Sequence, residues 1–166
     1  MKKIITLLLV SFVSMNAFSQ DAYIKLPQAK TKNSSFIFNK NVIGNESVLK
    51  GLGSTEQEVK DKVEGISVII DKPSRESADY YNLTELGILF VDLKEKLISK
   101  TQSELNDFFG LDKQTEIYVD GYLIESKKYK IAQKGIVEIE VVEPDTTNTL
   151  TTKVLNIWTL KKSERY

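Results

Sequence analysis

The feature that most constrains the fold is an Asp-Gly pair, Asp120 and Gly121, between two apolar triplets at 117–119 and 122–124. Asp-Gly accepts the positive φ angles of a two-residue type I′ turn, which makes it the strongest short-range signal for a β-hairpin. A turn of this kind also fixes the register of its two strands. On one face of the hairpin we expect Ile117, Val119, Tyr122 and Ile124, and on the other face Tyr118 and Leu123.

A further strand is predicted after the hairpin, where apolar and acidic residues alternate between Gly135 and Val142. Alternation with a period of two places one set of side chains on each face of a strand. We therefore expect one buried face and one face in solvent. The buried set is Val137, Ile139 and Val141, and the solvated set is Glu138 and Glu140.

The first 19 residues have the three parts of a secretory signal peptide: two lysines, an apolar run over residues 4–13, and an end with small residues. Ala17 and Ser19 have the spacing that favours cleavage before Gln20. The apolar run is shorter than the roughly 20 residues of a spanning helix. We expect export of a soluble protein without a further membrane span. The periplasm is the expected destination, and secretion from the cell is the alternative.

Composition narrows the classes of function. The full chain has 23 basic and 23 acidic residues, so removing Lys2 and Lys3 leaves 21 against 23 and a net charge of −2. This charge predicts no nucleic-acid partner. The chain contains no Cys and no His, which excludes disulfides, Ser-His and Cys-His nucleophiles and most zinc sites. Enzyme chemistry would need carboxylates, Lys or Tyr.

The sequence predicts a single α+β domain over residues 36–166, preceded by a polar, flexible arm over residues 20–35. We expect five to seven strands, mostly in one antiparallel or mixed sheet, together with two short helices. Further strands are predicted at 35–39, 66–70, 86–93 and 152–160. The last of these is expected to be a free terminal strand of the sheet.

Two capping boxes mark the starts of the predicted helices. Ser54 with Gln57 opens the first helix, and Gly65 is placed to end it. Thr101 with Glu104 opens the second. The side chains predicted to anchor the second helix in the core are Leu105, Phe108 and Phe109.

One hypothesis of enzyme function rests on Glu138 and Glu140, whose carboxylates point the same way from a strand. Paired carboxylates can act as acid and base in a hydrolase, whereas a solvated strand face is the simpler interpretation. With Glu143 and Asp145 they form an acidic edge of the kind that Ca²⁺ prefers. No Asp-x-Asp-x-Asp-Gly loop supports a calcium site, and we assign no catalytic, cofactor-binding or metal-binding residue.

Four aromatic residues are the candidates for partner binding: Tyr80, Tyr81, Tyr122 and Trp158. The three tyrosines could form an exposed patch for a sugar or a peptide, whereas half-buried packing is the simpler interpretation. The expected partner is an envelope protein or a small ligand. The sequence leaves the oligomeric state open.

Three C-terminal segments resemble the end of the plug domain of TonB-dependent outer-membrane receptors. The hairpin at 117–124 resembles the family's apolar-apolar-Asp-Gly-apolar motif, and 136–142 resembles its Ile-Glu-x-Ile-Glu-Val-Val segment. Residues 153–161 resemble the strand that closes the plug, and 63–68 more faintly resemble an earlier Pro-Gly-Val-x-Val strand.

The chain also departs from this family pattern. Residues 144–153 lack the glycines that plugs carry between their last two strands, and no barrel segment follows. Neither a clear TonB box nor the family's Arg-Gly motif is present. The resemblance implies a plug-like fold without a transport barrel, with a binding role and no catalytic residues.

These observations lead to two main hypotheses of function. The first is an exported, non-enzymatic binding module of the bacterial cell envelope that works by adding a partner strand to a sheet edge. The second is a structural or assembly accessory protein of the envelope, which would form concentration-dependent oligomers.

Overall fold

The computed structural model describes residues 22–166 as one α+β domain, which confirms the predicted fold class. The predicted signal peptide lies outside these residues. The described chain forms ten strands in two mixed sheets, rather than five to seven strands mostly in one sheet. The count differs because several strands have only two or three residues, too few for a periodic pattern to reveal.

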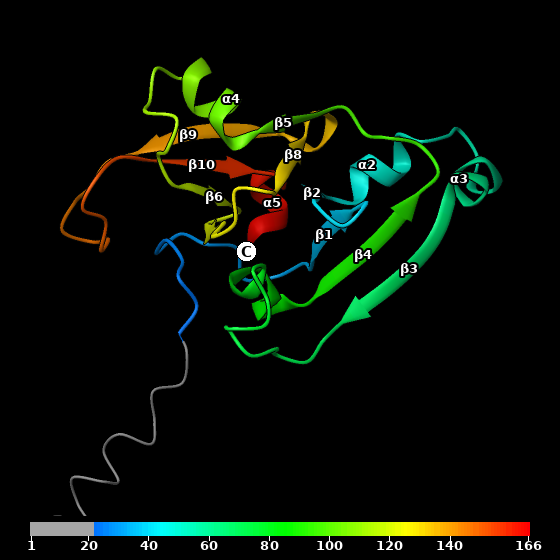
Figure 1. Ribbon diagram of the computed structural model, residues 1–166, viewed down its shortest axis with the longest axis horizontal. Helices are drawn as coiled ribbons and strands as arrows, with labels where there is room; N and C mark the ends of the chain where they lie inside the picture. The colour runs from blue at the N-terminus through cyan, green and yellow to red at the C-terminus, as the bar shows by residue number, and fades with distance from the viewer. Residues whose placement is uncertain (1–21) are drawn as a thin grey trace, which may run out of the picture.

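The larger sheet contains β1 Ser35–Phe38, β2 Val42–Gly44, β3 Val63–Ile69, β4 Ile88–Leu93, β5 Ser99–Thr101 and β8 Lys130–Ala132. Its strand order is β3-β4-β1-β2-β8-β5. β4 is parallel to β1 and antiparallel to β3. Figure 1 shows β3 as the outermost strand at the right of the molecule, with no strand beyond it.

The smaller sheet contains β6 Ile117–Val119, β7 Tyr122–Leu123, β9 Glu138–Val142 and β10 Val154–Trp158, in the order β7-β6-β10-β9. β10 is parallel to β6 on one side and antiparallel to β9 on the other. All five of its residues are buried. The prediction of a free terminal strand at 152–160 is therefore wrong, because both edges of that strand are paired.

The hairpin forms as predicted. Asp120 and Gly121 have φ angles of 52° and 87°, as a type I′ turn requires. Val119 pairs with Tyr122. A Cβ atom at Gly121 would lie 2.3 Å from the Cα atom of Ala29, so only glycine fits there. The four side chains predicted for the inner face, Ile117, Val119, Tyr122 and Ile124, all belong to the largest core cluster.

The helical elements are α2 Glu46–Lys50, α3 Glu56–Lys62, α4 Gln102–Phe108 and α5 Lys162–Arg165, with 3₁₀ turns η1 Tyr81–Leu86 and η2 Gln133–Gly135. The capping box of Thr101 and Glu104 is confirmed at α4. At α3 the N-cap is Thr55, one residue after the predicted Ser54. Gly65 does not end α3 but lies where the register of β3 and β4 shifts.

Two apolar clusters pack on opposite faces of the larger sheet. The first joins that sheet to the smaller one and includes Ile37 and Leu155. The second includes Phe38 and Val91, which α2 covers through Val48. The side chains of successive strand residues point to opposite faces of the sheet. Neighbours such as Ile37 and Phe38 therefore belong to different clusters.

Of the three side chains predicted to anchor α4, only Leu105 is buried. Phe108 is 83% exposed and Phe109 is 36% exposed, so the prediction is wrong for these two residues. The reason is that the buried face of α4 is formed by Gln102, Leu105 and Asn106. Phe108 points away from that face, and Phe109 lies just after the helix ends.

Residues 22–34 pack along the hairpin, and we call them the N-terminal strap. Leu26 and Lys30 are each 2% exposed. Their N–H groups donate to the carbonyls of Gly121 and Asp120 at 2.8 and 3.0 Å. The prediction of a flexible arm over residues 20–35 is therefore wrong for the described part. A polar composition indicated mobility, but the backbone of the strap completes the hydrogen bonds of the turn.

The Asp120 carboxylate ties the turn to two other segments. It accepts hydrogen bonds from the N–H and the hydroxyl of Thr159, both at 2.7 Å. Lys30 Nζ lies 3.4 Å from Asp120 Oδ2. Burial lowers the pKa of Lys30, although the neighbouring Asp120 raises it. The strap, the hairpin and the residue that follows β10 thus meet at one buried carboxylate.

We predict that Asp120→Asn lowers the free energy of unfolding by about 3 kcal/mol, because it leaves the Lys30 ammonium buried without a counter-charge. Asn tolerates the positive φ angle of this position. Adding Lys30→Met should recover most of the loss, since it removes the uncompensated charge. Urea unfolding of both variants measures this.

The matched control is Glu56→Gln, which breaks the exposed Glu56–Lys60 ion pair of α3 and should change stability by less than about 0.5 kcal/mol. A loss below about 1 kcal/mol in Asp120→Asn, or no recovery in the double variant, contradicts this role for the pair.

Candidate functional site

The four aromatic residues predicted to bind a partner lie inside the protein. Tyr81, Tyr122 and Trp158 are 0%, 2% and 1% exposed, and Tyr80 is half-buried against the core. They therefore form no exposed aromatic patch, and the simpler interpretation, packing inside the protein, agrees with the structure. Each of these side chains is large enough to fill core volume, which residue type alone does not distinguish from a binding role.

Tyr81 and Tyr80 pack in two separate aromatic contacts. Tyr81 stacks on Tyr23 of the strap with ring centroids 5.1 Å apart. Tyr80 meets Phe90 of β4 edge-on at 5.3 Å. The two tyrosines thus hold the loop before β4 against the strap and against the larger sheet.

Tyr122 joins a polar chain at the edge of the hairpin. Its hydroxyl donates to Glu85 Oε2 at 2.6 Å, and Lys25 Nζ lies 2.6 Å from Glu85 Oε1. Burial raises the pKa of Tyr122, and the Glu85 carboxylate raises it further. For Glu85, burial acts to raise the pKa, but hydrogen bonds from Lys25 and Tyr122 outweigh it and leave that pKa lowered.

The acidic residues of β9 contact side chains of β10 and α5. Glu140 accepts hydrogen bonds from Asn156 Nδ2 at 2.8 Å and from Trp158 Nε1 at 2.9 Å. Arg165 Nη2 lies 2.6 Å from Glu138, and its hydrogen bond lowers the pKa of that carboxyl. The guanidinium also lies 3.8 Å from the centroid of the Trp158 ring.

This arrangement differs from the alternation predicted for β9. Val137 and Val141 are 47% and 40% exposed, whereas Glu138 and Glu140 are half-buried. The prediction of a solvated glutamate face is wrong, because Arg165 and the buried polar groups of β10 supply partners for both carboxylates.

The acidic edge considered for Ca²⁺ does not converge on one point. Glu143 pairs with Lys153 at 2.7 Å, and the Asp145 carboxylate accepts the N–H of Thr147 in its own turn. Within residues 22–166, no group of three or more acidic side chains is placed to hold a metal ion.

Four strands form the sheet edges: β3 and β5 in the larger sheet, β7 and β9 in the smaller. The strap covers β7, where Lys25 bridges to Tyr122. β5 has three residues and leads directly into α4. β9 carries Glu138 and Glu140, and charged side chains protect an edge from further pairing.

β3 carries one charged side chain, Glu64 near its start, and the rest of the strand has no charge. Three of its successive same-face side chains are exposed: Ile66 by 59%, Val68 by 54% and Ile70, the residue after the strand end, by 81%. Residues 65–70 contain no charge and no proline. We call these three side chains, with the outer backbone of the strand, the β3 surface.

The local sequence explains why this segment is a strand. Residues 66–70 are Ile, Ser, Val, Ile and Ile, which are rich in the β-branched residues that strands favour. Pairing with β4 continues through Ile69, opposite Ile88. The inner edge is therefore satisfied, and the outer edge presents backbone N–H and C=O groups to solvent.

The β3 surface continues across the sheet into a groove. Val68 pairs with Leu89 of β4, and Leu89 pairs with Phe36 of β1, so these three side chains share one face. Phe36, Leu89 and Val137 line a groove of about 540 Å³ whose rim carries Lys50. An apolar row thus runs from the free edge to the middle of the sheet.

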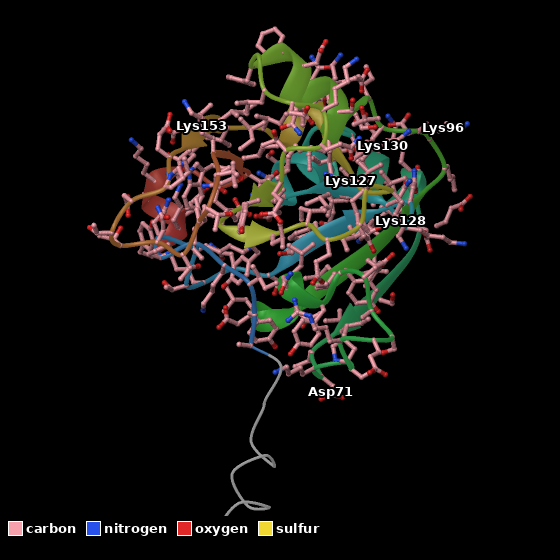
Figure 2. All side chains as sticks on the ribbon, turned by 60° about the vertical axis from the view of Figure 1, so that its left-hand side comes forward. Asp71, Lys96, Lys127, Lys128, Lys130 and Lys153 are labelled. Carbon is pink, nitrogen blue, oxygen red and sulfur yellow. The ribbon has the colours of Figure 1, made fainter. Side chains whose placement is uncertain are left out.

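Figure 2 labels one carboxylate, Asp71, and five lysines. Figure 2 shows Asp71 at the lower end of the molecule, apart from the labelled lysines. Among those lysines, Lys128 pairs with Asp79 at 2.5 Å. The uncharged stretch at 65–70 is thus flanked by Glu64 on one side and by Asp71 on the other.

Comparison with protein-family models, with curated proteins and with solved structures finds no significant match to this chain. The resemblance to the receptor plug therefore stays a prediction. The resemblance rests mainly on residues 117–124, 136–142 and 153–161. These segments contain β6, β7, β9 and β10, which belong to one sheet. Across residues 22–166, no helix has the length and apolar character needed to cross a membrane.

The signals for the β3 surface were present in the sequence but incomplete. Alternation cannot assign residues 66–70 to a single buried face, because Ile69 and Ile70 are consecutive. Whether such a strand is central or at an edge depends on which strands pair with it. No local pattern reports that pairing.

We predict that the stability of the domain falls as the pH drops from about 6 towards 3, partly because of Glu85. The folded-state pKa of this carboxyl lies below its unfolded value. The contribution of Glu85 to stability is therefore complete above the pKa that this carboxyl has in the unfolded chain. It is lost as the pH falls through the lower pKa of the folded state. Urea unfolding across this range should show a shallower pH dependence for Glu85→Gln.

Tyr122→Phe serves as the matched variant, because it removes only one hydrogen bond to Glu85 and should flatten the profile less. Parallel profiles for wild type and Glu85→Gln would show that Glu85 does not contribute to the pH dependence.

Proposed function

We propose that the chain is an exported, non-enzymatic interaction module of the bacterial cell envelope, with a plug-like fold and no transport barrel. It binds an extended segment of a partner protein by strand addition to β3. Export and the periplasmic location rest on the signal peptide predicted over residues 1–19.

The observation that carries this proposal is the β3 edge, which pairs with no other described strand and has no charge over residues 65–70. A seven-residue strand offers a full row of backbone hydrogen bonds, which give affinity in strand addition. The exposed side chains of Ile66, Val68 and Ile70 give apolar contacts on one face. A partner strand with alternating apolar residues would complement both features.

The carboxylate hydrolase is supported less well. Its two candidate residues, Glu138 and Glu140, are engaged by Arg165 and by the side chains of Asn156 and Trp158. An acid and base pair needs carboxyl groups that face a substrate pocket. The groove that contains Phe36 and Leu89 is lined by neither of these two glutamates.

Photo-crosslinking tests the proposal directly. A photoreactive amino acid at position 68 should capture a protein from a bacterial envelope extract, and mass spectrometry should map the crosslink to an extended segment of that protein. Ile66→Lys should reduce capture by about tenfold, because it places a charge on the edge. Its effect on stability should stay within about 0.5 kcal/mol, since Ile66 is exposed.

The control position is Lys100 on β5, the opposite edge strand of the same sheet. Equal capture from positions 68 and 100, or capture unaffected by Ile66→Lys, would remove the basis for strand addition at β3.

A further inference from the structure

We infer that the strand added to β3 is β3 of a second copy of this chain, antiparallel to the first, with Val68 on the two-fold axis. This inference rests on the proposed function and names its partner. A two-fold axis perpendicular to the sheet pairs the same surface of both copies, as in most homodimers. It also joins the two larger sheets into one continuous sheet.

The pattern of β3 is complementary to itself in this register. With Val68 opposite Val68 of the second copy, Ile66 lies opposite Ile70 on the same face. Directly opposed side chains on one face are the pairs that stabilise an antiparallel ladder. All three exposed side chains therefore meet apolar partners. Glu64 falls opposite position 72, a lysine beyond the end of the strand.

Neighbouring symmetric registers are less favourable. Two residues that face each other across the ladder must have their side chains on the same face of the sheet. The two-fold axis must therefore pass through a residue, and a different register moves the axis to another residue of the strand. Centring on Ser67 places Glu64 opposite Ile70, and centring on Ile69 places Ile66 opposite Lys72. Each of these registers sets a charge against an apolar side chain, which the register centred on Val68 avoids.

Two further features favour a second copy. The net charge of residues 20–166 is −2, from 21 basic and 23 acidic residues after Lys2 and Lys3 are removed; such a low charge does not oppose self-association. In addition, an unprotected edge invites uncontrolled pairing, and a closed dimer covers both edges at once.

The dimer has a consequence for the groove beside β3. An axis perpendicular to the sheet keeps the faces of both copies on the same side. The apolar row through Val68, Leu89 and Phe36 therefore continues into its counterpart. One face of the dimer carries two copies of the groove, related by the axis.

Cysteine crosslinking tests the register, because the chain has no cysteine of its own. Val68→Cys should form a disulfide dimer under mild oxidation, since opposed Cβ atoms in a ladder are about 5 Å apart. Ile66→Cys and Ile70→Cys should each crosslink with themselves about tenfold more slowly, because four residues of strand separate the two thiols by about 13 Å. A mixture of these two variants should give the mixed dimer.

The second measurement is the molecular mass of the unsubstituted chain in solution, obtained by light scattering. We expect a dimer that Val68→Lys converts to a monomer with an unchanged circular dichroism spectrum. A wild-type monomer at every concentration overturns the inference, as does self-crosslinking of position 66 or 70 that is as fast as at position 68.

The two proposals fail in distinguishable ways. If Val68→Cys does not crosslink to itself while position 68 still captures an envelope protein, the second-copy inference falls and strand addition stands. If neither self-pairing nor capture depends on the β3 surface, both proposals fall.

Discussion

The fold depends on the buried Asp120 carboxylate and on the turn that carries it. Asp120 accepts two hydrogen bonds from Thr159 and faces Lys30. Its own carbonyl accepts the N–H of Lys30, and its N–H donates to the Ile157 carbonyl at 2.9 Å. One residue thus connects the start of the described chain, the hairpin and the central strand β10. A charge this deeply buried is tolerated because each of its oxygens has a partner.

This connection determines which sheet edges remain available. Because the strap is held on the turn, it covers β7, and β10 is enclosed between β6 and β9. The larger sheet has no equivalent cover at β3. The inner edge of β3 pairs with β4. Helices α2 and α3 pack on the same face of the sheet as Val68, over its far end. An exposed edge and an exposed apolar face therefore coincide on the same strand.

Local chemistry was enough to predict the hairpin at Asp120 and Gly121 and the capping box of α4, because each depends on residues within a few positions. It also predicted the mixture of short helices and strands. The inner face of the hairpin followed from its register. These predictions are confirmed because the turn and the cap need no information about distant segments.

Long-range packing decided the features that were predicted wrongly. Trp158 is buried because β10 is central, and sequence pattern does not report strand order. Glu138 is half-buried because Arg165 reaches it from α5, and the strap is ordered because the turn supplies its hydrogen-bond partners. The β3 surface was missed for the same reason. Its exposure follows from the lack of a second neighbour among the described strands.

The central claim is that the outer edge of β3 is open in the isolated chain and becomes paired on association. Amide hydrogen exchange of residues 66–70, measured at about 1 µM and at about 200 µM protein, tests it most directly. The claim predicts that alternate amides, those on the outer edge, exchange rapidly in the dilute sample and become protected in the concentrated one. Equal exchange at both concentrations, with envelope extract also giving no protection, would contradict it.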